Sequence, residues 1–129
     1  MVTLTFKTRY KSQMVDITKE VTETIIKRGI KNGIATLFLP HSTAGLVIFE
    51  NSDISLRREF LNSLNSLVIE KEYTHPNAPA HLKAGFLKNS LTLLVKDGQI
   101  LLGRWQGIFL VELDGPRERT LFVKVTGGN

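Results

Sequence analysis

The first residues of the chain alternate between apolar and polar side chains, with threonines separating Val2, Leu4 and Phe6. This period of two is typical of a strand with one buried face. Two later runs, 33–40 and 45–50, are almost continuously apolar and are bounded by glycine, proline or polar residues. They predict two buried strands that follow each other closely. The last third of the chain contains four more apolar runs, at 90–95, 99–105, 107–113 and 120–125.

Three other segments show the period of an α-helix, in which apolar side chains recur every three or four residues. The clearest begins near a capping Ser52 or Asp53 and has spacings of four, four and three between Leu56, Phe60, Leu64 and Leu67. A shorter helix is predicted over 18–28, with one apolar face made by Val21, Ile25 and Ile26. The segment 80–89 is predicted to form a third short helix or a turn.

These elements predict the α+β class: a compact single domain over residues 1–129, with antiparallel-rich β-sheets in a sandwich and two or three short helices. The Asp97-Gly98 pair between two apolar runs is typical of a hairpin, because its turn needs positive φ angles. No internal repeat or low-complexity linker divides the chain, and a chain of this length can bury a core without disulfides.

Composition narrows the classes of partner. There are no cysteines, which excludes disulfides, thiolate metal ligands and a cysteine nucleophile. No apolar run approaches the roughly 20 residues of a membrane span, and nothing resembles an export signal, so we expect a cytoplasmic protein without a membrane partner. The net charge of +5 favours anionic ligands. Because the basic residues form no stripe with interleaved aromatics, we expect a small phosphorylated metabolite rather than a nucleic acid.

The three histidines, His41, His75 and His81, each lie in a predicted loop or at the edge of a predicted element. Imidazole is the commonest protein metal ligand, and three of them can hold a divalent ion while leaving coordination positions open. His75 and His81 are six residues apart across a proline-rich loop, whereas His41 would come from another strand. The commoner alternative is three unrelated surface or core histidines, and no HExxH-type motif decides between the two.

Acidic and hydroxyl side chains offer further chemistry. Glu50 and Asp53, with Asn51 between them, are candidates for a general base or for orienting a histidine. The commoner role for such residues before a helix is capping. Ser42 and Thr43 directly follow the first histidine, but no GxSxG turn supports a serine nucleophile.

The only tryptophan, Trp105, lies between two glycines in the segment GRWQG, 103–107. Glycines allow close backbone approach, so the indole is suited either to stacking on a flat ligand or to filling the core. Core packing is the commoner role.

Taken in order, these motifs resemble the YjbQ-like family, which is also labelled secondary thiamine-phosphate synthase. The resemblance runs over nearly the whole chain, through PHSTAGLVIFENSD (40–53) and the segment from YTHP to FLVEL (73–113). Its most specific part extends from Ser90 through Gly98 to GRWQGI (103–108). All three histidines fall on motif histidines of the family.

The resemblance implies a homotrimer with a pocket near a subunit boundary, in which a divalent metal or an anion is held by His41, His75 and His81. The metal expected with such ligands is zinc-like or another transition metal, with magnesium as an alternative. Glu50 and Asp53 are the implied catalytic residues. The implied ligand-binding residues are Ser42, Thr43, Asn51, Lys83, Ser90, Arg104, Trp105 and Gln106.

Two features depart from the family pattern. Arg104 stands where the family usually has Thr or Ser, and if it faces the pocket its charge favours a phosphate. The loop between His75 and His81 is shorter than the acidic, glycine-rich version of many members. The rim of the predicted site should therefore be less acidic and more open.

The implied function is a transferase that joins hydroxymethylpyrimidine diphosphate to a thiazole phosphate and releases pyrophosphate. Lys83 or Arg104 would stabilise the departing diphosphate, and Trp105 would stack on the pyrimidine. Diphosphate chemistry usually uses Mg²⁺ with carboxylates, so a histidine site suggests that this reaction is a side activity. Two alternatives stay open: a metal-assisted hydrolase or lyase with Glu50 or Asp53 as base, and a non-catalytic trimeric module that binds a metabolite.

Overall fold

The computed structural model describes residues 1–128 and contains eight strands and three helices within them. In chain order these are β1 (Val2–Lys7), β2 (Gln13–Asp16), α1 (Thr18–Lys27), β3 (Asn32–Phe38), β4 (Ala44–Glu50), α2 (Ile54–Ser66), α3 (Ala78–Ala84), β5 (Ser90–Lys96), β6 (Gln99–Ile100), β7 (Gln106–Glu112) and β8 (Glu118–Gly128). The α+β class predicted from the sequence is therefore confirmed.

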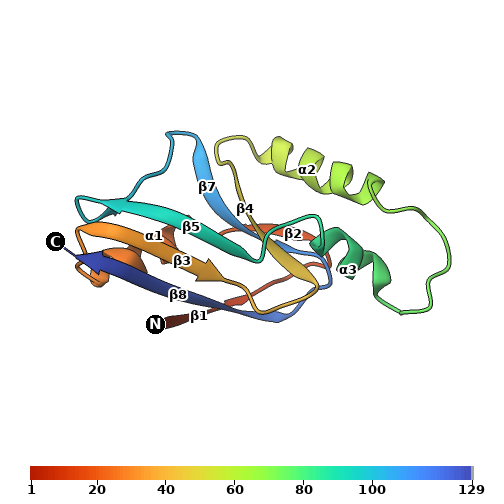
Figure 1. Ribbon diagram of the computed structural model, residues 1–129. Coiled ribbons are helices and arrows are strands. Elements are labelled where there is room, and N and C mark those ends of the chain that lie inside the picture. Colours follow the sequence, from red (N-terminus) through yellow and green to blue (C-terminus); the bar gives the residue numbers. More distant parts are fainter. Residues whose placement is uncertain (129) are drawn as a thin grey trace.

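The strands form two antiparallel sheets. One has five strands in the order β1-β8-β3-β5-β6, and the other has three in the order β2-β7-β4. Every strand pair within them is antiparallel, as the hairpin-rich sequence predicted. Figure 1 shows the long strands of the five-stranded sheet lying together, with α2 and α3 beside β4 at the other side of the molecule.

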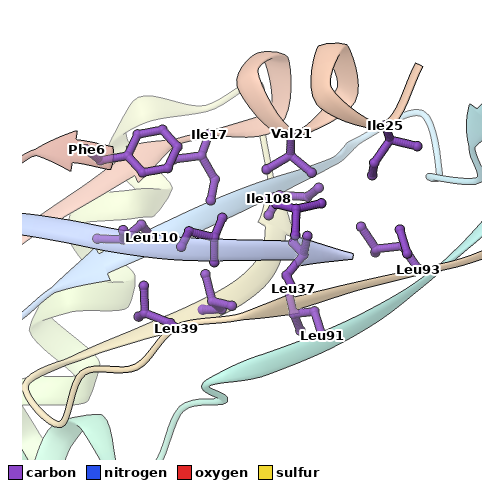
Figure 2. Close-up of a cluster of buried hydrophobic side chains, with 14 of the residues drawn as sticks. Phe6, Ile17, Val21, Ile25, Leu37, Leu39, Leu91, Leu93, Ile108 and Leu110 are labelled. Carbon is purple, nitrogen blue, oxygen red and sulfur yellow. The ribbon is translucent and has the colours of Figure 1, made fainter. Parts of the chain in front are cut away.

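The main core lies between the two sheets and α1 (Figure 2). Helix α1 inserts Val21 and Ile25, both with no exposed surface, toward Ile108 of β7 and Leu37 of β3. Ile26 was predicted on the same face but is 50% exposed. Each helical residue is rotated by about 100° from the one before it, so Ile26 turns away when Ile25 points inward.

A second core lies between the three-stranded sheet and the helices α2 and α3. Phe60 and Leu64 of α2 pack there with Ala80 of α3 and Phe109 of β7. The prediction that Leu67 continues this face is wrong, because the helix ends at Ser66 and Leu67 is 58% exposed.

The contact between β4 and the segment after α3 depends on Gly45. A Cβ atom at Gly45 would lie only 2.6 Å from Cβ of Leu87, closer than real side chains pack. The missing side chain thus lets the segment that follows α3 approach β4, where Leu46 and Lys88 exchange backbone hydrogen bonds.

One face of the five-stranded sheet is exposed in the chain and carries apolar side chains. Ile34, Phe38 and Leu94 are 43%, 45% and 57% exposed. Ile34 lies opposite Leu94, and Phe38 lies opposite Phe122, so these residues share the face. The apolar run 33–40 predicted a strand buried on both faces, but within one chain β3 buries only alternate residues.

The hairpin predicted at Asp97-Gly98 is present, and both residues have positive φ angles, 53° and 78°. The strand after it, β6, has only two residues, so most of the predicted strand 99–105 is a loop that leads into β7. Among residues 1–128, no helix has the length and apolar character needed to cross a membrane.

Candidate functional site

His41 lies just beyond the end of β3 and is half-buried. Its Nε2 atom accepts a hydrogen bond of 2.9 Å from the backbone N–H of Thr120 in β8. Within β8, the pairing with β3 begins at Phe122. Thr120 lies before that point, so the His41 ring accepts its N–H in place of a β3 carbonyl. Burial lowers the pKa of His41 below 6.5, and the nearby Arg119 charge lowers it further. The ring is therefore uncharged at neutral pH.

A buried charged network lies behind His41. Arg119 donates to both carboxylate oxygens of Glu112, through Nε at 2.8 Å and through Nη2. The same Nη2 donates to the carbonyl oxygen of Thr43 at 3.1 Å and to its Oγ1 at 2.9 Å. Thr8 Oγ1 also donates to Glu112, at 2.8 Å. All four residues are at most 6% exposed, so the network is sealed inside the protein.

The charges in this network are retained although they are buried. Burial alone would raise the pKa of Glu112, but hydrogen bonds from Arg119, the amide of Asp114 and the hydroxyl of Thr8 outweigh it and lower that pKa. Neither Glu112 nor Arg119 was singled out from the sequence. The one available signal was a lone carboxylate within the apolar run 107–113.

His75 and His81 are brought together by the loop before α3 and by α3 itself. Their ring centres are 5.1 Å apart, and the rings are nearly perpendicular. They line an open hollow of about 360 Å³ together with Tyr73, Ala78 and Leu82. This hollow combines imidazole nitrogens with mostly apolar walls.

A second hollow, of about 290 Å³, shares Tyr73 with the first and is more polar. Lys71 and Lys83 line it, and the Lys71 ammonium lies 5.1 Å from the centre of the Tyr73 ring. Lys83 Nζ donates to Asn65 Oδ1 at 2.6 Å. Burial lowers the pKa of Lys83, and the charge of nearby Lys11 lowers it further. Glu70 also lines this hollow, so its charged side chains are two lysines and one carboxylate.

Asp114 connects these hollows to the segment that carries His41. Its Oδ2 atom accepts a hydrogen bond of 3.1 Å from Nδ2 of Asn77, two residues after His75. The preceding residue, Leu113, donates its N–H to the Thr43 carbonyl at 3.2 Å. We call this region, with His41, His75, His81 and Lys83, the histidine end of the molecule.

The predicted metal centre requires three ligand side chains around one point. Among residues 1–128, no three His, Cys, Asp or Glu side chains are placed to hold one ion. The Nε2 lone pair of His41 is engaged by Thr120, which leaves His75 and His81 as neighbours. The three histidines of a single chain therefore do not fit a shared three-ligand centre.

The other predicted residues gather at the far ends of β4 and β7, a region we call the tryptophan end. Asn51 donates its N–H to the Trp105 carbonyl at 3.1 Å and its Nδ2 to the Gln106 carbonyl at 3.3 Å. The Arg104 guanidinium lies 5.0 Å from the Trp105 ring centre. Trp105 is 55% exposed, so the interpretation as a core residue is wrong. The indole is open to a ligand or a partner.

Asp53 caps the start of α2, and Glu50 at the end of β4 holds the turn before the helix. Asp53 accepts from the N–H and the hydroxyl of Ser55 at 2.9 and 2.6 Å, and Glu50 accepts from the amides of Ser52 and Asp53. Hydrogen bonds from the Ser52 side chain and the Asp53 amide hold the pKa of Glu50 below its usual value, and those from Ser55 do the same for Asp53. Both carboxylates are thus ionised hydrogen-bond acceptors at neutral pH.

The two ends are separated by the length of a strand pair. β4 pairs with β7 from Ala44 opposite Glu112 to Glu50 opposite Gln106. Six residue steps at about 3.4 Å each make this separation about 20 Å. The remaining predicted residues, Ser42 and Ser90, are both exposed, one beside His41 and the other opposite Phe38.

Comparison with known proteins gives a consistent picture. The family model described as "UPF0047 protein YjbQ-like" matches residues 2–128. A UPF0047 protein of Methanocaldococcus jannaschii is 42% identical over 124 residues, 94% of this chain and 90% of its own. The UPF0047 protein YugU of Bacillus subtilis is 37% identical over 129 residues, 97% of this chain and 98% of its own.

Solved structures agree. A YjbQ/UPF0047 family protein of Clostridium acetobutylicum has a TM-score of 0.93 at 36% identity, over 98% of this chain and 100% of its own. A YjbQ-like protein of Sulfolobus solfataricus has a TM-score of 0.92 at 37% identity, over 98% and 95%. Identity at this level over nearly the full chain shows common descent as well as a common fold, and the chain belongs to the UPF0047 (YjbQ-like) family.

Proposed function

We propose that this protein binds a small phosphorylated metabolite with a flat ring at the histidine end, and joins it to a second phosphorylated ring as a thiamine-phosphate synthase does. The observation that carries the proposal is the pair of hollows that share Tyr73. One is mostly apolar and lined by imidazoles, and the other is more polar and lined by two lysines and Glu70. A phosphorylated heterocycle has two matching parts: a flat ring for the first hollow and a negatively charged phosphate for the second.

The hollow with His75, His81 and Leu82 suits the ring of such a ligand. Its walls supply apolar and aromatic contacts, and its imidazoles supply hydrogen bonds to ring nitrogens. The phosphate group belongs next to Lys71 and Lys83. Burial and, to a smaller extent, the nearby Lys11 charge lower the Lys83 pKa, and an anion there would favour the charged form of Lys83.

The proposed reaction needs little covalent chemistry from the protein. The thiazole nitrogen attacks the methylene carbon of hydroxymethylpyrimidine diphosphate. The carbon–oxygen bond to the diphosphate breaks, and its electron pair leaves with pyrophosphate. Lys71 and Lys83 would stabilise the negative charge on the departing group. The thiazole nitrogen has no proton to lose, so no general base is required at this step.

We further propose a homotrimer in which each site is completed by a neighbouring subunit. The apolar face with Ile34, Phe38 and Leu94 supports association, because such a patch is usually covered by a partner. The tryptophan end lies about 20 Å from the histidine end of its own chain. In an assembly it would be free to meet the histidine end of another chain, and Trp105 would then stack on the second ring.

The second candidate is a non-catalytic module that binds the same class of metabolite. The observation in its favour is that Asp53 is engaged in capping α2 and Glu50 in hydrogen bonds to the turn before it. A hydrolase or lyase reaction needs a base at the ligand, and within one chain these two carboxylates are at the opposite end. The sequence predicted a divalent metal on His41, His75 and His81, of which we keep only His75 and His81 as proposed ligands, and elemental analysis of tag-free protein tests it.

Complementation of a strain without thiamine-phosphate synthase tests the transferase, together with pyrophosphate release by the purified protein. Lys83→Gln should lower pyrophosphate release about tenfold or more, because it removes a charge that stabilises the leaving group. Lys27→Gln, which replaces an exposed lysine at the end of α1, is the matched control and should be unchanged. Binding of both substrates without any turnover would favour the non-catalytic module, and no binding would contradict both candidates.

A further inference from the structure

The backbone of β8 determines which nitrogen of His41 carries the proton. The Thr120 N–H can only donate, so the Nε2 atom that it contacts at 2.9 Å must present a lone pair. A neutral imidazole with a lone pair on Nε2 has its proton on Nδ1. Protonating Nε2 would set two N–H groups against each other and leave the Thr120 amide without an acceptor.

The buried network holds the segment next to His41 in place. Arg119 clamps Thr43 through both the carbonyl and the hydroxyl, and Leu113 donates to the same carbonyl. Arg119 is in turn oriented by two contacts with Glu112. Thr43 is only two residues from His41, so this clamp limits how far the imidazole can move away from Thr120.

The other nitrogen of the ring faces outward. Among residues 1–128, Nδ1 has no hydrogen-bond partner, and it is not sealed from solvent. An N–H group with these properties is suited to donate to an oxygen atom of a ligand. It is not suited to bind a metal ion, which needs a lone pair where this nitrogen carries its proton.

We propose that His41 is a neutral hydrogen-bond donor, with its proton on Nδ1, that contacts an anionic oxygen of the ligand and does not bind a metal. Glu112 and Arg119 are positioning residues that maintain this state through Thr43. The identity of the ligand oxygen, but not the state of the ring, rests on the proposed function. This role of His41 differs from the one predicted from the sequence, in which all three histidines bind one ion.

The first experiment uses ¹⁵N-histidine-labelled full-length protein and long-range ¹H–¹⁵N correlation spectra at neutral pH. The His41 pattern should be that of the Nδ1–H tautomer, and added zinc should perturb at most His75 and His81. A proton on Nε2, or a zinc shift at His41 comparable to those of the other two, would overturn the inference. Inorganic phosphate is then titrated in, and if His41, His75 and His81 all fail to respond, the proposed function is contradicted while the tautomer result stands.

Two pairs of variants separate donation from structure. His41→Asn places an amide donor near the Nδ1 position, whereas His41→Gln places its amide near Nε2. Phosphate affinity should fall about tenfold more in His41→Gln than in His41→Asn, the usual effect of a lost hydrogen bond to a charged group. The reverse order would contradict donation from Nδ1.

The second pair tests the clamp. Thr43→Val removes the hydroxyl that Arg119 contacts, and Thr43→Ser keeps it. The Nδ1–H pattern of His41 should broaden or become mixed in Thr43→Val and persist in Thr43→Ser, at similar melting temperatures. An unchanged pattern in Thr43→Val would show that the network does not position His41.

Discussion

Glu112 and Arg119 form an ion pair that is buried inside the molecule. Removing two charges from water is costly, and their attraction compensates only when the remaining donors and acceptors are also satisfied. Here Thr8, Thr43 and the amides of Leu113 and Asp114 complete the set. Such a pair adds little net stability over apolar residues, but losing one partner leaves an uncompensated charge in the core.

Glu112→Gln should therefore lower the free energy of unfolding at pH 7 by about 3–5 kcal/mol. The side chain keeps its shape but no longer balances the Arg119 charge. Urea unfolding at pH 7 measures the effect. As a control, replacing both partners with apolar residues, Glu112→Leu with Arg119→Met, should cost less than the single change. A larger loss in the double variant would contradict this account.

The same carboxylate predicts a dependence of stability on pH. The pKa of Glu112 is lower in the folded protein than its ordinary value of 4.5 in an unfolded chain. Its contribution is thus fully present above about pH 4.5 and is lost as the pH falls through the lower folded value. Urea unfolding between pH 3 and 7 should show a steeper decline on the acid side for the natural protein than for Glu112→Gln. Equal slopes would mean that Glu112 does not titrate with unfolding.

At the scale of single elements, Glu50 and Asp53 before α2 were predicted to have either of two roles, a structural one and a catalytic one. Asp53 is the N-cap of the helix, where unpaired amides need acceptors, and Glu50, the last residue of β4, accepts from the amides of the turn that leads into it. Their hydrogen bonds fully account for their position. A catalytic role would have to be added to this structural one, with the ligand brought by a neighbouring subunit.

Substitution of Asp53 distinguishes these roles. Asp53→Ala should destabilise the protein by about 1 kcal/mol because the Ser55 amide loses its acceptor, whereas Asp53→Asn should change it by only a few tenths, since asparagine also caps helices. Urea unfolding gives the stabilities, and pyrophosphate release gives the activity. An Asp53→Asn protein that is stable but inactive would show that the charge itself has a role in the reaction.

At the scale of the whole molecule, the predicted site residues lie at two ends of one strand pair, and an apolar face lies on the five-stranded sheet. Within one chain the two ends do not meet, and the apolar face is exposed. A symmetric assembly would cover Ile34, Phe38 and Leu94 and bring unlike ends of different chains together. The proposed function therefore ties activity to the proposed oligomeric state.

Leu94→Lys should dissociate the proposed trimer, because the ammonium groups would have to lose water within the interface. Light scattering after gel filtration should show the mass falling from three chains to one chain of 14.5 kDa. Ile26→Lys, at a similarly exposed apolar position on α1, is the control and should leave the mass unchanged. Loss of assembly in both variants, or in neither, would contradict an interface on this face.

The sequence by itself determined the elements whose signals are local. Alternation predicted β1, the Asp97-Gly98 turn predicted a hairpin, and periodicity predicted α1 and α2 within a residue or two of their ends. These succeeded because propensity and patterning act over a few neighbouring residues. The motif order also indicated the family, which the comparisons then showed.

Only the tertiary structure decided which distant residues meet. It paired Glu112 with Arg119, placed Thr120 against His41, and separated Glu50 from the histidines by the length of β4. No local pattern encodes these contacts, because they depend on strand register and on how the two sheets stack. The exposure of Trp105 has the same origin, since burial is a property of the packed fold and not of the residue.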